Sequence, residues 1–267
     1  MTQHQTMLNV SNISVEFGGL KAVSDFSMQV KQGTIHALIG PNGAGKSTVF
    51  NCISRFYTPN QGSVKFMGED LIPLPASQMA ARGIARSFQN LELFSELTAL
   101  DNVLLGTHAL QKQSVLTPMQ KLSRLFTTPD KPATEFAESL LERVGLADAR
   151  HVLAKDMNFG HQKLLELARA MAIRPKLLLL DEPAAGLRNR EIESLDRILK
   201  EMVAKDGMTV LLVEHVMQLV MSISDEITVL AFGKKIAEGV PKEVANNPLV
   251  IEAYLGTDAV AQAKGAQ

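Results

Sequence analysis

Residues 40–48 carry the clearest chemistry in the chain. They fit the phosphate-binding pattern G-x-x-x-x-G-K-[ST]. Glycines let the backbone curl with its N–H groups inward, and a helix that starts after the loop favours an anion. We expect Lys46 at the β- and γ-phosphates and the Ser47 hydroxyl at Mg²⁺; the alternative is an ordinary glycine turn with a solvated lysine. The residues expected to line the nucleotide are Gly40, Pro41, Asn42, Gly43, Ala44, Gly45, Lys46, Ser47 and Thr48.

Two carboxylates follow a second apolar run. Residues 177–180 are four leucines, which is typical of a strand buried on both faces, and they lead directly into Asp181 and Glu182. Open α/β sheets bind ligands at the carboxyl ends of their strands. We therefore expect Asp181 to hold Mg²⁺, directly or through water, and Glu182 to act as the general base. The structural alternative is that both carboxylates begin a solvated loop.

Four further residues are weaker candidates. His215 follows the apolar run 209–213 and could donate to the γ-phosphate or orient the base, although such a histidine is often structural. The amide of Gln89 could touch a metal or water, although most glutamines lie on the surface. Phe17 could stack on a nucleobase, although aromatic residues in strands are usually core. Gly160 precedes a helix and could form a second phosphate site, although a glycine there is commonly only a cap.

Hydrophobic periodicity predicts the elements that position these residues. Residues 35–39 form a buried strand before the phosphate loop, and residues 49–53 continue as a helix after it. Alternating segments predict an antiparallel sheet near the N-terminus, and continuous apolar runs predict parallel strands. The expected strands are 8–10, 13–17, 26–30, 64–67, 177–180, 209–213 and 227–230. The expected helices are 76–82, 97–110, 115–126, 133–145, 163–173 and 191–205, with a loop at 127–132 and a short helix that starts at Pro241.

The predicted fold class is α/β. A mostly parallel sheet with flanking helices is joined by an N-terminal antiparallel β-subdomain and by a helical subdomain. One domain covers 8–256: residues 8–86 and 161–256 form the core, residues 87–160 form the helical subdomain, and 257–267 form a flexible tail.

Composition excludes several classes of protein. The 267 residues carry a formal net charge of −1, so no bulk attraction to nucleic acid is expected. Cys52 is the only cysteine, so no intrachain disulfide can form. Residues 1–7 lack an apolar signal region, and no stretch has about 18 consecutive apolar residues. We expect any membrane role to come through partner subunits.

Taken together, these residues resemble the ATP-binding subunits of ABC transporters over about 8–256. Residues 40–48 match Walker A, residues 177–182 match Walker B, and residues 185–188 fall at the D-loop. The resemblance implies a Q-loop glutamine at Gln89, a switch histidine at His215 and adenine stacking by Phe17. The signature LSGGQ is replaced by residues 157–161, in which Gly160 is retained while Asn158, Phe159 and His161 depart. By resemblance, Asn158, Gly160 and His161 contact nucleotide.

This altered signature is similar to the form of the signature in the ATPases of importers of branched-chain amino acids (LIV-type). Residues 50–53, the long segment at about 107–135, residues 182–187 and the ending 247–256 resemble the same group. This implies a head-to-tail pair with a second, non-identical ATPase subunit, with each ATP between Walker A of one subunit and the signature of the other. Two membrane permeases and, indirectly, a substrate-binding protein complete the assembly. The expected location is the cytoplasmic face of the cell membrane.

Other functions stay open at the level of the sequence. A soluble ABC ATPase often carries two cassettes or a coiled-coil insert, whereas this chain has one cassette and no sustained heptads. A P-loop kinase would need an acceptor site, for which no motif is present. A lipopolysaccharide exporter can share the ending Tyr254-Leu255-Gly256, although its signature is usually closer to LSGGQ. An importer of urea or of other amino acids would use the same ATPase.

Overall fold

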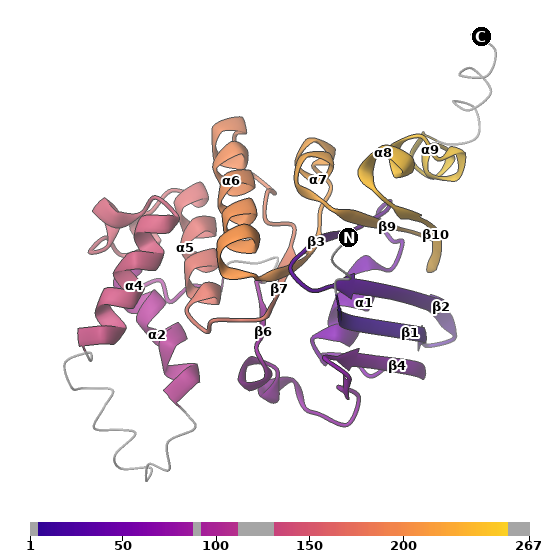
Figure 1. The fold of residues 1–267 in the computed structure, drawn as a ribbon, viewed down its shortest axis with the longest axis horizontal. Coiled ribbons are helices and arrows are strands. Elements are labelled where there is room, and N and C mark those ends of the chain that lie inside the picture. Colours follow the sequence, from indigo (N-terminus) through magenta and orange to yellow (C-terminus); the bar gives the residue numbers. More distant parts are fainter. Residues whose placement is uncertain (1–4, 88–91, 112–130, 256–267) are drawn as a thin grey trace.

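The computed structural model describes residues 5–87, 92–111 and 131–255. Figure 1 shows two sheets side by side, with a group of helices at the far end of the larger one. Among the described residues, no helix has the length and apolarity needed to cross a membrane. The expected α/β class, with an antiparallel β-subdomain and a helical part, is confirmed.

The larger sheet has the strand order β10-β9-β3-β8-β7-β6. All neighbours are parallel except β10, which is antiparallel to β9. The predicted strands at 35–39 and 209–213 have the expected bounds, and the one at 177–180 extends by one residue to include Asp181. The bounds are β3 Ile35–Ile39, β6 Ile84–Arg86, β7 Leu177–Asp181, β8 Thr209–Val213, β9 Glu226–Ala231 and β10 Lys234–Gly239.

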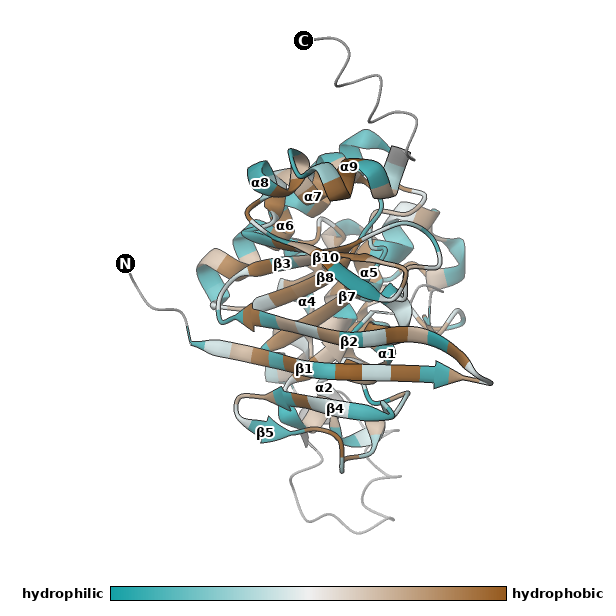
Figure 2. Ribbon diagram, turned by 90° about the vertical axis from the view of Figure 1, so that its right-hand side faces the viewer, coloured by the Kyte–Doolittle hydropathy of each residue, from teal (hydrophilic) through white to brown (hydrophobic). Residues whose placement is uncertain are grey.

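The smaller sheet is antiparallel, with the order β2-β1-β4-β5. Buried and exposed residues alternate along β1 and β2, and the hydropathy colours in Figure 2 alternate with them. This pattern fits a sheet with one buried face and one solvated face, as predicted. The bounds are β1 Thr6–Phe17, β2 Leu20–Lys31, β4 Gln61–Phe66 and β5 Glu69–Asp70.

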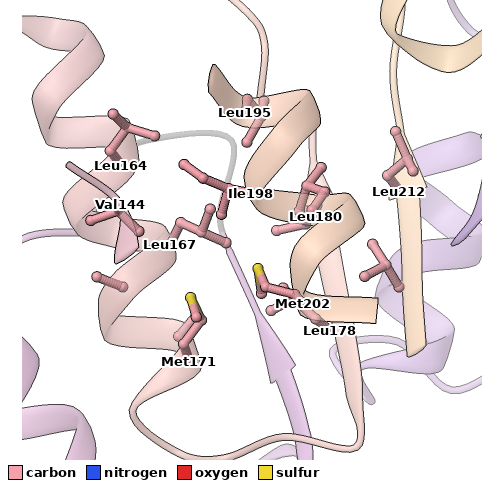
Figure 3. Packing of buried hydrophobic residues seen from close by; sticks show 14 of the residues in the cluster. Val144, Leu164, Leu167, Met171, Leu178, Leu180, Leu195, Ile198, Met202 and Leu212 are labelled. Atoms are coloured by element: carbon pink, nitrogen blue, oxygen red, sulfur yellow. The ribbon is translucent and has the colours of Figure 1, made fainter. Parts of the chain in front are cut away.

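Strand β7 separates two hydrophobic cores. Leu177 and Leu179 face a core shared with the antiparallel sheet and the first helix, α1 (Lys46–Ile53). Leu178 and Leu180 face the opposite core. Figure 3 shows this second core, in which they meet Ile198 and Met202 of α6 and, from α5, Leu164, Leu167 and Met171. The run of leucines is therefore buried on both faces, because helices cover one face and α1 together with the antiparallel sheet covers the other.

The remaining helices fall into two groups. Helices α2, α4 and α5 pack on one another in the unit at the far end of Figure 1, and α6 to α9 follow along the large sheet. Their bounds are α2 Ala99–Gln111, α4 Lys131–Arg143, α5 Phe159–Met171, α6 Asn189–Asp206, α7 Met217–Ile223, α8 Pro241–Ala245 and α9 Pro248–Leu255. A boundary between residues 160 and 161 would cut α5. We therefore propose that the helical subdomain extends to Met171 and that the core resumes after it.

Three sequence predictions need correction. Residues 76–82 form two short 3-10 turns, Ala76–Gln78 and Ala80–Arg82, which end at Gly83 in the left-handed region. The last two residues of the loop predicted at 127–132 belong to α4, which begins at Lys131 and accommodates proline in its first turn, and the rest of that prediction lies outside the described residues. The helix predicted at 163–173 begins four residues earlier, where Asn158 caps it. The helix predicted at 115–126 lies outside the described residues.

His36 is a buried titratable group in the centre of the large sheet. Its Nε2 lies 2.8 Å from Thr228 Oγ1, and that hydroxyl donates to Glu238 Oε1 at 2.9 Å. The imidazole therefore donates from Nε2, while its buried Nδ1 has no hydrogen-bond partner among the described residues. Burial lowers the pKa of His36 from 6.5 to about 4, and the nearby Glu226 and Glu238 oppose this only in part.

We predict that His36 makes the fold sensitive to acid. The unfolded chain binds the proton near pH 6.5 and the folded chain only near 4, so the free energy of unfolding falls as the pH decreases through this window. The loss attributable to His36 between pH 7 and pH 5 is about 2 kcal/mol. Urea denaturation at both pH values should show a smaller pH dependence in His36→Gln than in the wild type. His151→Gln, at an exposed position, is the control; equal pH dependence in all three proteins would contradict the prediction.

Candidate active site

Four neighbouring parallel strands bring the candidate residues to one edge of the large sheet. In sheet order, β3 leads to the phosphate loop, β8 to Glu214 and His215, β7 to Asp181 and Glu182, and β6 to Ser87. Parallel strands end on the same side, so residues far apart in the sequence meet there. The sheet therefore builds a single cluster of polar groups from four separate segments.

The phosphate loop has no room for side chains at two of its glycines. Gly40 and Gly45 have φ values of 150° and 104°. A Cβ atom on Gly40 would lie 1.9 Å from the carbonyl oxygen of Leu230, and one on Gly45 would lie 2.6 Å from that of Ala22. Both positions need glycine for space as well as for backbone conformation. The loop is thus held closely between β9 and β2.

Lys46 supplies a positive charge inside this loop. Its Nζ donates to the carbonyl oxygens of Gly40 at 2.8 Å and Pro41 at 3.0 Å. Burial lowers the pKa of Lys46, and the nearby Glu182 and Asp181 oppose that shift. Ser47 is exposed in the first turn of α1. The loop therefore combines a partly desolvated ammonium, a helix N-terminus and an accessible hydroxyl, which together suit a phosphate chain.

Asp181 and Glu182 sit side by side in different environments. Asp181 is buried, and its Oδ2 accepts a hydrogen bond from Arg86 Nη2 at 2.9 Å. Glu182 adopts a φ of 50°, which non-glycine residues rarely do. Its Oε1 lies 2.8 Å from Nε2 of His215, and both of these side chains are partly exposed. The strained backbone turns Glu182 toward His215 and solvent, where a base can reach water.

Glu214 is a site residue that the sequence reasoning missed. Its carboxylate is almost fully buried, and Oε1 accepts a hydrogen bond from the N–H of Ala184 at 2.6 Å. Oε2 accepts from the N–H groups of His215 at 2.8 Å and Val216 at 3.0 Å. Glu214 therefore joins the loop after Glu182 to the loop that carries His215. The available signal was an acidic residue directly after a buried strand.

Residues 157–161, which replace the signature, lie at the start of α5. Asn158 Oδ1 accepts a hydrogen bond from the N–H of His161 at 2.9 Å and so caps α5. A Cβ on Gly160 would lie 2.2 Å from Oε1 of Glu191, and the ring of Phe159 packs on Gly186. Within the described residues, no hydrogen bond of this segment reaches the phosphate loop. The structure thus gathers Lys46, Asp181, Glu182 and His215, and within the described residues it shows no hydrogen bond from Asn158, Gly160 or His161 to this group.

The two remaining candidates differ in what the structure shows. Phe17 is about half exposed at the end of β1, and its ring meets Tyr57 edge-on with centroids 5.3 Å apart. It is therefore accessible, unlike the core aromatic that the alternative reading describes. Gln89 lies outside the described residues.

The donor set fits magnesium in company with a nucleotide. Within the described ranges, no three His, Cys, Asp or Glu residues form a cluster that could hold a metal alone. The Oδ1 atom of Asp181 accepts no hydrogen bond from a described residue, and the Ser47 hydroxyl is exposed. Mg²⁺ is commonly held by one carboxylate and a few other oxygens together with substrate phosphates. These two residues could provide the protein's share.

Comparison with known families agrees with this geometry. The profile of the ABC transporter family matches residues 23–185, which is more than half of the chain. A solved nucleotide-free ATP-binding cassette from an ABC transporter superimposes with a TM-score of 0.81 at 30% identity, covering 94% of this chain and all of that one. A cassette in its ADP conformation gives the same TM-score at 31% identity, covering 94% of this chain and 99% of that one. Fold and site therefore define an ATP-binding cassette.

The curated relatives narrow this class. The chain is 42% identical over 250 residues to the high-affinity branched-chain amino acid transport ATP-binding protein BraF of Pseudomonas aeruginosa, covering 94% of this chain and 98% of BraF. It is 41% identical over 252 residues to LivG of Escherichia coli, with the same coverage. A profile for branched-chain amino acid ATP-binding cassette transporters matches residues 234–260. The chain belongs to this family of ATP-binding cassettes.

We predict that Glu214→Gln impairs turnover more than nucleotide binding. Both carboxylate oxygens accept backbone N–H groups, whereas glutamine offers one acceptor and turns an amide donor toward the other N–H groups. An unsatisfied buried donor costs about 1–3 kcal/mol, so we expect kcat for ATP hydrolysis to fall about tenfold. KM for ATP should change less than about twofold, because the phosphate loop is untouched.

Glu201→Gln makes the same chemical change on the surface of α6 and is the matched control. A thermal melt of each variant separates a general loss of stability from a change at the site. An unaltered kcat for Glu214→Gln would mean that Glu214 only fills the interior.

Proposed function

We propose that the chain is the ATP-hydrolysing subunit of an ABC importer for branched-chain amino acids. The observation that carries this proposal is the convergence of Lys46, Asp181, Glu182 and His215 at one edge of the sheet. BraF and LivG, whose names state branched-chain amino acid transport, share about two-fifths of their residues with this chain. Membership of the ABC family removes the P-loop kinase alternative.

In the proposed mechanism, the chain's own groups hold the triphosphate and activate water. Lys46 and the backbone N–H groups of residues 43–48 bind the β- and γ-phosphates, and Phe17 stacks on the adenine. Ser47 and Asp181 would hold Mg²⁺, which would neutralise phosphate charge. Glu182 removes a proton from water as the water oxygen attacks the γ-phosphorus. The bond between the γ-phosphorus and the oxygen of ADP breaks, which leaves phosphate and ADP. His215 steadies Glu182 and the γ-phosphate, and Gln89 is assigned to the metal or the water.

We propose that the signature segment acts together with a second subunit. Asn158, Gly160 and His161 form no hydrogen bond with the phosphate loop of their own chain within the described residues. We assign them to the nucleotide of a partner ATPase, which in this proposal is a non-identical chain. Each site is then complete only when two subunits close on ATP, and hydrolysis reopens them.

The remaining partners follow from the same assignment. Two membrane permeases carry the solute, and a substrate-binding protein delivers it. The ATPase is placed on the cytoplasmic face of the membrane, held there by the permeases. The lipopolysaccharide export protein LptB of Haemophilus influenzae is also similar, at 31% identity over 251 residues, covering 94% of this chain and 98% of LptB. The match of residues 234–260 to the branched-chain profile favours amino acid import.

Replacing Lys46 tests the nucleotide site. Lys46→Ala removes the cation at the phosphates, and we expect ATP affinity measured by calorimetry to fall at least about tenfold. Lys65→Ala, at an exposed position of β4, removes an equal charge away from the site and should bind ATP as the wild type does. Equal ATP affinity in Lys46→Ala and Lys65→Ala would overturn the role of the phosphate loop.

Replacing Glu182 tests the chemistry. Glu182→Gln keeps the side-chain volume but removes the base, so ATP binding should persist while steady-state hydrolysis by the assembled complex falls about a hundredfold or more. Phosphate release from the complex with its permeases is the measurement. Hydrolysis at the wild-type rate would remove Glu182 from the mechanism.

The cargo is tested by uptake. Proteoliposomes that contain this subunit with its permeases and binding protein should accumulate labelled leucine when ATP is enclosed, and those with Glu182→Gln should not. Uptake of another solute but not of leucine would separate a wrong cargo from a wrong ATPase assignment.

A further inference from the structure

Arg86 is a buried cation that the mechanism above does not use. It is the last residue of β6, next to β7 in the sheet, and its side chain is 11% exposed. Its Nη2 donates to Oδ2 of Asp181 at 2.9 Å, and the Asp181 side chain is 6% exposed. A buried carboxylate needs such a partner, because an isolated charge in the interior is strongly unfavourable.

The guanidinium is fixed from several sides. Its Nη1 donates to Asn51 Oδ1 at 2.7 Å and to Ser54 Oγ at 2.6 Å. Ser54 Oγ in turn donates to the carbonyl of Phe50 at 2.8 Å, so its lone pair is free to accept from Arg86. The rings of Phe50 and Phe56 lie 5.6 Å and 5.5 Å from the guanidinium carbon. This environment suits a planar fork and leaves it little freedom to move.

These contacts connect the two halves of the proposed metal site. Asn51 lies in α1, the helix that begins with Lys46 and Ser47, and Ser54 is its C-cap. Asp181 belongs to β7. Arg86 therefore joins the element that carries Ser47 to the strand that carries Asp181. Because it contacts Oδ2, the Oδ1 atom of Asp181 remains without a hydrogen bond from any described residue.

We propose that Arg86 is a positioning residue for magnesium: it holds Asp181 by one oxygen, at a fixed place relative to α1, so that the other oxygen is presented to the ion. The proposal rests on the assignment of Mg²⁺ to Ser47 and Asp181 under the proposed function. Arg86 acts through Asp181 and does not itself contact the ion or the nucleotide.

A simple charge argument predicts instead that Arg86 weakens the binding of Mg²⁺. A cation beside Asp181 repels Mg²⁺ and competes with it for the carboxylate. Competition would require Arg86 to release Asp181 when the ion binds. The hydrogen bonds to Asn51 and Ser54 and the two rings keep the guanidinium in place independently of Asp181, so the geometry favours positioning.

Two substitutions separate the two effects. Arg86→Lys keeps the charge but loses the fork that reaches three acceptors at once, and Arg86→Gln loses both. The measurement is the affinity of the full chain for the non-hydrolysable analogue AMP-PNP by calorimetry, with Mg²⁺ and with EDTA. The dissociation constant in EDTA divided by the dissociation constant with Mg²⁺ is the magnesium-dependent gain in affinity.

Positioning predicts that the gain falls about tenfold in both variants, while the affinity in EDTA stays within about twofold of the wild type. Arg82→Gln, which removes an arginine from the exposed pair with Glu69, should match the wild type in both conditions. A larger gain in Arg86→Gln with a wild-type gain in Arg86→Lys would show competition and overturn the proposal. An unchanged gain in both variants, even with a lowered melting temperature, would reduce Arg86 to a packing role.

A double-mutant cycle isolates the path through Asp181. Asp181→Asn should remove most of the gain, and adding Arg86→Lys to it should cause no further loss. If Arg86→Lys lowers the gain of Asp181→Asn by as much as it lowers the gain of the wild type, Arg86 acts on another group and the proposal is overturned. If Asp181→Asn itself keeps the full gain, the metal assignment under the proposed function fails instead, so the two failures are distinguishable.

Discussion

The site depends on the parallel pairing of β3, β8 and β7. Because β8 lies between the other two, the residues after it fall between the phosphate loop and the Walker B carboxylates. The pairing is stabilised because the strands are buried on both faces, one under helices and the other under α1 and the antiparallel sheet. A shift of one residue in any of these strands would exchange its two faces and rotate its terminal polar residue away from the others. The register of these strands therefore sets where the polar residues lie at the strand ends.

Each buried charge at this edge is compensated within the chain. Lys46 is stabilised by hydrogen bonds to loop carbonyls and by the nearby carboxylates, Asp181 by the charge of Arg86, and Glu214 by hydrogen bonds from three backbone N–H groups. Glu182 and His215 are the partly exposed pair. The compensated groups define a rigid frame, because releasing one would leave a desolvated charge. The exposed pair is where solvent can enter and where a proton can be transferred.

Sequence reasoning succeeded where a local pattern fixes the outcome. The apolar run 177–180 is typical of a central strand, and the pattern G-x-x-x-x-G-K-[ST] between a buried strand and a helix identified residues 40–48 as a phosphate loop. It failed where the role comes from tertiary contact: Arg86 meets Asp181 across 95 positions, and Glu214 meets Ala184 across 30. Strand β10 was missed because it is an edge strand of exposed and half-buried residues, which leaves no clear apolar pattern. Residues 76–82 look helical by composition, yet Gly83 ends them after two short turns.

The signature segment makes no hydrogen bond to the phosphate loop within the described residues, and this has a consequence for the proposed mechanism. Helix α5 belongs to the helical unit, and its N-terminal residues pack on the loop that follows Glu182, through Phe159 and Gly186. A nucleotide shared between two subunits would then touch α5 of one chain and the phosphate loop of the other. Under the proposed function, a movement of the loop that follows Glu182 would meet Phe159 directly. Under the proposed function, the packing of Phe159 on Gly186 would link the loop after Glu182 to the segment assigned to the nucleotide of the partner subunit, and such a link is the coupling that an ATP-driven two-state pair requires.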